Sequence, residues 1–156
     1  MAQDEKDTAG VIAPPPFLYL GFLLIGLALD YLWPIAVFPD GVQYTGGFAL
    51  IGLSAVIVAY TLPQFRRART NFSLYKPTTA LITGGPFRFS RNPSYLSLSL
   101  LYVGIGIVTD NLWILGLLVP TLAVMHYGVI AREERYLERR FGEEYRRYKA
   151  TVRRWL

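Results

Sequence analysis

The residues best suited to chemistry are two arginines beside an expected helix start and a pair of adjacent carboxylates about forty residues later. Arg88 and Arg91 precede Asn92, which is expected to cap a helix by accepting a backbone N–H on its side-chain oxygen, and Pro93, which suits the first turn. The free N–H groups of a helix start, together with the arginines, would form a small anion site. The alternative is an ordinary capped helix with arginines at the membrane surface.

Glu133 and Glu134 supply the carboxylates. Adjacent residues on a helix point about 100° apart, so one glutamate can face inward while the other pairs with an arginine. With the arginines and the helix start, they would suit a zwitterionic amino-acid ligand, whose ammonium would bind Glu and whose carboxylate would bind Arg or the helix N–H groups. The alternative is that both glutamates are solvated and matched to Arg135, Arg88 or lipid headgroups.

Four long stretches almost without charge predict the elements that position these side chains. Residues 41–65, 92–109 and 111–131 contain no Asp, Glu, Lys or Arg, and residues 17–38 contain only Asp30. A helix of roughly 20 such residues crosses a bilayer. The sequence therefore predicts an all-α integral membrane four-helix bundle, with spans near residues 17–33, 47–62, 93–108 and 112–130.

Both ends of the chain are expected to lie outside this bundle. Residues 1–16 are polar and then proline-rich, which predicts a disordered cytoplasmic tail before a single membrane domain of residues 17–156. After the fourth span, apolar residues recur on one face of residues 131–154, which predicts an interfacial amphipathic helix that Gly142 could break. Asp30 is expected near the outer interface, and its role stays open.

The charge distribution predicts how the bundle is oriented. Six of the 16 Lys and Arg residues lie between residues 66 and 91, and nine lie between residues 132 and 154. Because positive charge collects on the cytoplasmic side of short loops, both termini and the active site are expected there, and nucleic-acid binding is not expected. The chain has no cysteine and only His126 as a histidine, so neither a disulfide nor a metal site is expected. Its acidic N-terminus does not predict a cleaved signal peptide.

Residues 85–96, which read Gly-Pro-Phe-Arg-Phe-Ser-Arg-Asn-Pro-Ser-Tyr-Leu, are followed by Glu-Glu-Arg-Tyr-Leu from residue 133 and Phe-Gly-Glu-Glu-Tyr from residue 141. This ordered pair of motifs resembles the isoprenylcysteine carboxyl methyltransferase and phospholipid methyltransferase superfamily. In that family an Arg-His-Pro-x-Tyr-x-Gly segment and a later Glu-Glu pair form the S-adenosylmethionine site. Here Asn92 stands where the family commonly has His, and Ser97 where it commonly has Gly.

The resemblance implies a cofactor site at matching positions of this sequence. Gly85 and Pro86 would shape its loop, and Arg88 and Asn92 would complete it. The candidate cofactor-binding residues are Gly85, Pro86, Arg88, Arg91, Asn92, Pro93, Tyr95, Glu133 and Glu134.

The implied reaction is methyl transfer from S-adenosylmethionine to a lipophilic acceptor, such as an isoprenylcysteine or a lipid, that enters sideways from the bilayer. Alignment should matter more than acid–base chemistry. The candidate catalytic residues are Arg91, His126 and Glu134. A carboxylate acceptor would need no base, whereas an amine would lose a proton, and histidine is the side chain that most commonly accepts one at neutral pH.

Two other functions stay open. A non-catalytic membrane protein would bind anionic lipid or a partner through its basic loop and tail, with salt-sensitive liposome binding and no saturable affinity for the cofactor. The second alternative is a reductase related to membrane sterol reductases. Against it, Gly104-Ile105-Gly106 lacks the preceding strand and the third glycine of a dinucleotide-binding fingerprint. The sequence does not identify the acceptor or the oligomeric state.

Overall fold

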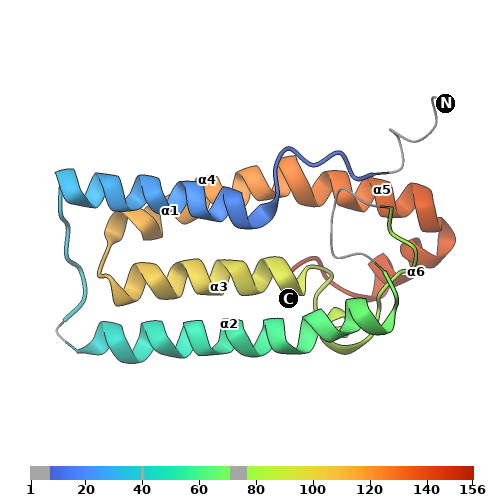
Figure 1. Ribbon diagram of the computed structural model, residues 1–156, viewed down its shortest axis with the longest axis horizontal. Helices are drawn as coiled ribbons and strands as arrows, with labels where there is room; N and C mark the ends of the chain where they lie inside the picture. Colours follow the sequence, from blue (N-terminus) through green and yellow to red (C-terminus); the bar gives the residue numbers. More distant parts are fainter. Residues whose placement is uncertain (1–7, 40, 71–76) are drawn as a thin grey trace.

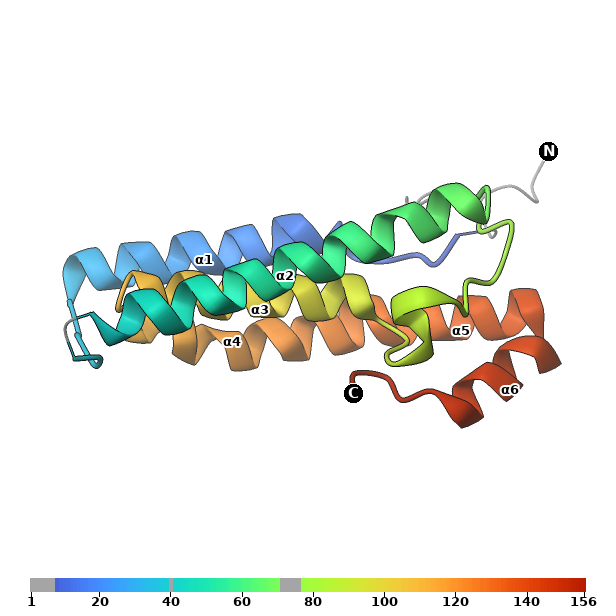
Figure 2. The ribbon, with the colours of Figure 1, turned by 90° about the horizontal axis from the view of Figure 1, so that it is seen from below.

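The computed structural model describes residues 8–39, 41–70 and 77–156, and within these ranges every regular element is a helix. A 3-10 turn at Gly85–Arg88 precedes the third long helix, and a π-helical turn at His126–Ile130 joins the fourth to the fifth. Beyond the bundle, α5 and α6 form a hairpin (Figure 1; Figure 2). The α-helices are α1 (Pro15–Leu32), α2 (Val42–Arg67), α3 (Pro93–Val108), α4 (Leu112–Met125), α5 (Ala131–Phe141) and α6 (Glu143–Thr151).

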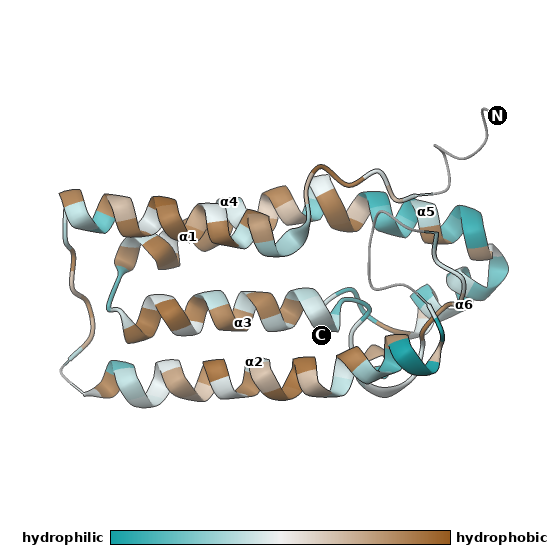
Figure 3. Cartoon of the chain, in the orientation of Figure 1, coloured by the Kyte–Doolittle hydropathy of each residue, from teal (hydrophilic) through white to brown (hydrophobic). Residues whose placement is uncertain are grey.

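Three helices are long and apolar enough to cross a membrane: α1, α2 and the continuous helix Leu112–Phe141. The apolar helix α3 has 16 residues and is shorter. Hydrophobic residues dominate α1 to α4, while hydrophilic residues gather on α5, α6 and the last turn of α2 (Figure 3). The architecture is therefore an all-helical membrane bundle with one polar end, and a membrane span for α3 stays a prediction.

The helix bounds differ from the sequence-based expectation in α2, whereas the break that Gly142 could cause in the C-terminal helix is present. α2 runs past Pro63, which lies inside the helix instead of ending it. The helix expected over residues 131–154 is divided into α5 and α6 at Gly142, whose φ of +53° is a conformation that glycine adopts readily. The chain therefore folds back on itself beyond the bundle, so α6 approaches the loop before α3.

Small residues bring α2 and α3 into close contact. A Cβ atom added to Gly47 would lie 2.8 Å from the carbonyl oxygen of Gly104, and one added to Gly104 would lie 2.9 Å from that of Gly47. Further along, the buried Ser54 donates a hydrogen bond to the Ser97 carbonyl oxygen at 2.7 Å. Such residues let two membrane helices approach along their length, which fixes α2 beside the start of α3.

The segment before α1 packs onto the π-helical turn. Val11 is buried, and the Ile12 N–H donates to the carbonyl oxygen of Gly128 at 3.2 Å. Arg132 also donates to the Gly10 carbonyl oxygen at 2.8 Å. Residues 8–14 of the tail predicted as disordered are thus held against the helices, while residues 1–7 lie outside the described residues.

Replacing Gly47 with Ala should lower the free energy of unfolding by about 1–3 kcal/mol, since the added methyl group overlaps the α3 backbone. Its neighbour Gly46 faces open space, with nothing within 4 Å of an added Cβ. Gly46→Ala is therefore the matched control, and it should be neutral or more stable by up to about 1 kcal/mol. Thermal unfolding of both variants in detergent checks this; equal midpoints would contradict the close packing of α2 on α3.

Candidate active site

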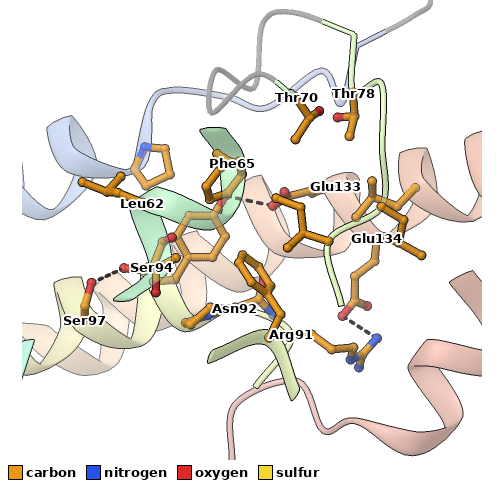
Figure 4. A pocket seen from close by; sticks show the side chains of 18 of the residues that line it. Leu62, Phe65, Thr70, Thr78, Arg91, Asn92, Ser94, Ser97, Glu133 and Glu134 are labelled. Atoms are coloured by element: carbon orange, nitrogen blue, oxygen red, sulfur yellow. Dashed lines mark hydrogen bonds and ion pairs between the residues drawn. The ribbon is translucent and has the colours of Figure 1, made fainter. Parts of the chain in front are cut away.

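A cavity of about 630 Å³ lies at the polar end of the bundle, between the starts of α1 and α3, the last turns of α2, and α5 and α6. Its size falls within the roughly 300–1,000 Å³ of small-molecule sites. One wall is apolar and includes Pro14, Pro15, Pro16, Val58, Leu62 and Phe65. The polar side chains of the lining, here called the polar wall, are Arg91, Asn92, Tyr95, Glu133, Glu134, Tyr145 and Tyr148. Figure 4 labels Arg91, Asn92, Glu133 and Glu134 among them.

The loop before α3 is fixed from two sides. Gly85 has a φ of +58°, and a Cβ atom there would lie 2.6 Å from Nε2 of Gln64, so glycine suits this approach to α2. The Phe87 ring meets Phe65 edge to face with centroids 5.7 Å apart. From α6, the Tyr148 hydroxyl donates to the Phe87 carbonyl oxygen at 2.7 Å. These contacts set the path by which Arg91 reaches the cavity.

Asn92 stands at the N-cap position of α3, but its side chain makes no capping hydrogen bond. Its Nδ2 donates instead to the carbonyl oxygen of Arg154 at 3.0 Å, and its own carbonyl oxygen accepts the N–H groups of Tyr95 and Leu96. The predicted side-chain cap is therefore wrong. The chain end provides a carbonyl acceptor that orients the amide away from the helix start.

Glu133 is half-buried in the cavity wall. Its Oε2 accepts a hydrogen bond from the hydroxyl of the buried Tyr95 at 2.8 Å. Among the described residues, no Lys or Arg lies within ion-pair distance of this carboxylate. Burial raises the pKa of Glu133 to about 7, although the Tyr95 hydrogen bond lowers it. Glu133 therefore presents to the cavity a carboxyl group without a cationic partner in the described part of the chain, and a bound cation would favour its ionised form.

Glu134 is buried and is paired with two arginines. Arg154 binds it with two hydrogen bonds, from Nε to Oε1 at 2.9 Å and from Nη2 to Oε2 at 2.6 Å. Arg91 approaches the same Oε1 through Nη1 at 3.2 Å, and Figure 4 marks this ion pair. The adjacent glutamates thus differ in surroundings, since one carboxylate is neutralised twice and the other is not.

The Arg91 side chain is only 9% exposed, and it lines the cavity. Its Nη1 contacts Glu134 and donates to the Tyr145 hydroxyl at 3.4 Å, whereas its buried Nε has no hydrogen-bond partner. A buried N–H without a partner is rare in folded proteins. Within the described ranges, the guanidinium group of Arg91 is a candidate for binding a carboxylate or carbonyl oxygen of a ligand.

Two phenols support this polar wall. Burial and the negative charge of Glu134 raise the pKa of Tyr145 to about 12. Burial also raises the pKa of Tyr148, with a further contribution from Tyr145. Both hydroxyls therefore keep their protons at neutral pH, so Tyr148 remains a hydrogen-bond donor to the loop before α3.

Six of the candidate residues line the cavity together: Arg91, Asn92, Pro93, Tyr95, Glu133 and Glu134. Gly85 and Pro86 lie in the 3-10 turn behind its wall, and Arg88 is exposed. His126 is half-buried outside the wall, with its Nδ1 atom 3.4 Å from Nη1 of Arg154. Its predicted catalytic role stays a prediction.

Sequence reasoning missed Arg154, because no local pattern connects it with a glutamate 20 residues earlier. Tyr145 and Tyr148 were recognised only as apolar members of a helix face, although their hydroxyls contact the cavity loop. In the described part of the chain, no three His, Cys, Asp or Glu side chains form a group that could hold a metal ion.

Comparison with known proteins identifies one family. The model described as phospholipid methyltransferase matches residues 42–144, a range that contains α2, α3, α4 and α5. A protein of Haemophilus influenzae described as uncharacterized is 49% identical over 64 residues, which are 40% of this chain and 98% of that protein. No solved structure matches the chain.

Two further relatives carry names that concern metal resistance. The nickel-cobalt-cadmium resistance protein NccN of Alcaligenes xylosoxydans xylosoxydans is 32% identical over 68 residues. The cobalt-zinc-cadmium resistance protein CzcN of Cupriavidus metallidurans is 34% identical over 68 residues. Each match covers 44% of this chain, and the chain spans about a third of each protein's length, at 32%.

Glu134→Gln should destabilise the protein by about 3 kcal/mol, because it leaves two arginines without their shared carboxylate. Glu133→Gln is the matched control on the adjacent residue. It removes a charge that has no cationic partner in the described residues and still accepts the Tyr95 hydrogen bond, so it should be neutral or stabilising. Thermal unfolding in detergent compares the two, and a larger loss for Glu133→Gln would contradict the assigned pairing.

Proposed function

The chain belongs to the phospholipid methyltransferase family, and we propose that it transfers a methyl group from S-adenosylmethionine to a lipophilic acceptor at this cavity. The observation that supports this most directly is the division of the cavity into a polar wall, with a carboxyl group that has no cationic partner among the described residues, and an apolar wall. A charged cofactor suits the first wall and a lipid-like acceptor suits the second.

The residues of the polar wall fit the charges of S-adenosylmethionine. Glu133 would bind its ammonium group, since this carboxylate has no cationic partner among the described residues. Arg91, whose guanidinium-bearing side chain lines the cavity, would bind its carboxylate. When bound, the cofactor supplies a methyl group on a sulfonium: the acceptor's lone pair forms the bond to the methyl carbon while the carbon–sulfur electron pair goes to sulfur.

The chain would contribute alignment and exclusion of water more than acid–base chemistry. Arg91 is held by Glu134 and Tyr145, so its position is fixed before a ligand arrives. A carboxylate acceptor is already ionised at neutral pH and would need no base, whereas an amine acceptor would release one proton. The apolar wall keeps bulk water from the reacting atoms.

The acceptor would enter between α1 and α2. α1 packs against α4 and α3, while α2 packs against α3. In the described residues, α1 and α2 therefore do not cover the sides on which they face each other. Pro16 at the start of α1 and Leu62 on α2 both line the cavity, and both helices are candidate membrane spans. We assign the cavity and the termini to the cytoplasmic side, in keeping with the basic residues of α5 and α6.

A second candidate function is binding of anionic lipid without catalysis. Arg132, Arg135 and Arg139 surround a small hollow together with Thr8 and Gly10 at the outer face of α5. Basic clusters beside a membrane span attract anionic headgroups. This function would give salt-sensitive binding to liposomes without saturable binding of S-adenosylmethionine. The names of two relatives concern resistance to metals, but the described residues contain no group of three His, Cys, Asp or Glu side chains that could hold a metal ion.

Isothermal titration calorimetry should show saturable binding of S-adenosylmethionine to the purified protein. Glu133→Gln should weaken this binding on the order of tenfold or more, because it removes the charge assigned to the ammonium group. Glu144→Gln, on the exposed face of α6, is the matched control and should bind as the unchanged protein does. Wild-type-like affinity in Glu133→Gln would rule out the assigned ammonium site.

Leu62→Trp should slow methyl transfer to lipid on the order of tenfold while leaving cofactor affinity unchanged, because the larger ring narrows the apolar side of the cavity. Leu53→Trp is the control, since Leu53 is exposed on the same helix but does not line the cavity. Mass spectrometry of lipid extract incubated with protein and methyl-labelled cofactor provides the measurement. Equal rates for the two variants would exclude access past Leu62.

A further inference from the structure

The last residues of the chain return to the cavity. Residues 152–156, here called the C-terminal strap, follow α6 and lie beside the start of α3 (Figure 1). The Arg153 carbonyl oxygen accepts the Arg91 N–H at 2.9 Å. The Arg154 carbonyl oxygen accepts both the Ser90 hydroxyl at 3.3 Å and the Asn92 amide at 3.0 Å. Three consecutive loop residues are thus hydrogen-bonded to the backbone of this strap.

The strap is itself held by a side chain on its other side. Arg154 binds Glu134 through two hydrogen bonds and lies with Nη1 3.4 Å from His126 Nδ1. Trp155 packs against the buried residues of the bundle. The backbone of residue 154 therefore faces the loop while its guanidinium group faces α5, so one residue connects the two sides of the polar wall.

We propose that Arg154 is a positioning residue, which holds residues 90–92 in the conformation that binds the cofactor by anchoring the strap on Glu134. Glu134 has the same role, since both of its oxygens are occupied by arginines. This inference rests on the proposed function only for the identity of the ligand that the loop would bind, which is S-adenosylmethionine. The ordering of the loop by the strap is a property of the protein without ligand.

The physical reason is that each contact alone is weak, but all of them depend on the strap being in place. Without the Arg154 guanidinium, Glu134 would have Arg91 as its only cationic partner in the described residues, and Arg91 would turn toward both of its oxygens. Ser90 and Asn92 would lose a fixed acceptor. The Arg91 side chain, which lines the cavity, would then no longer be held in one position, although the bundle helices are untouched.

The test compares Arg154→Gln with Arg153→Gln in the full-length protein. Both variants lose one positive charge from the strap, but the exposed Arg153 contributes only its backbone carbonyl oxygen to the loop. Hydrogen exchange of residues 87–92 is measured without cofactor. Exchange should be on the order of tenfold faster in Arg154→Gln and unchanged in Arg153→Gln, since only the first releases the strap.

The second readout separates positioning from catalysis. In Arg154→Gln the KM for S-adenosylmethionine should rise on the order of tenfold to a hundredfold while kcat at saturation stays within about twofold. Arg154→Lys keeps one charged contact and should recover part of the loss. Asn92→Leu, which removes a loop donor without changing charge, provides a second route if Arg154→Gln does not fold, and it should also accelerate exchange in the loop.

Unchanged loop exchange in both Arg154→Gln and Asn92→Leu would overturn the inference. Equal effects of Arg153→Gln and Arg154→Gln would also overturn it, because they would reflect loss of charge alone. If the unchanged protein binds no S-adenosylmethionine, the proposed function fails. The exchange measurement still decides whether the strap orders the loop, so the two failures are distinguishable.

Discussion

The ion pairs of Glu134 with Arg91 and Arg154 are the constraint on which the polar end of this bundle depends. They join three segments that are distant in sequence: the loop before α3, the start of α5 and the C-terminal strap. A carboxylate removed from water is unfavourable unless cations and hydrogen bonds compensate it. Loss of any one of the three segments would therefore remove at least one ion-pair partner from a charge at the polar end of the bundle.

This pairing also gives the adjacent residues Glu133 and Glu134 different surroundings. Arg91 and Arg154 are both directed at Glu134, which leaves Glu133 with a hydrogen bond from Tyr95 and no cationic partner among the described residues. This asymmetry fits the phospholipid methyltransferase family to which the chain belongs, since a methyl transfer needs a charged methyl donor and an acceptor aligned with it. α1 and α2 supply apolar residues to the same cavity.

Much of the helical framework follows from local sequence patterns, because uncharged apolar runs must form helices wherever a membrane surrounds them. The spacing of Glu133 and Glu134 also allowed one to face inward and the other to pair with an arginine, with solvation of both as the alternative. It did not identify Arg154 as the partner, because residues 20 positions apart share no periodic pattern. The expected cap by Asn92 failed for the same reason: a carbonyl group distant in sequence accepts a hydrogen bond from the side-chain amide nitrogen, and in this orientation the amide oxygen does not cap the helix. Pro63 was expected to end the second helix, but α2 continues through it to Arg67.

The π-helical turn at His126–Ile130 has a consequence for the phase of the long helix Leu112–Phe141. In a regular α-helix, His126 and Glu133 are seven residues apart and would project in nearly the same direction. A single wide turn accommodates about one extra residue, which rotates everything after it by roughly 100°. Inserting one amino acid at such a turn can therefore rotate the carboxylates of Glu133 and Glu134 to a new direction, while α4, which precedes the turn, keeps its orientation.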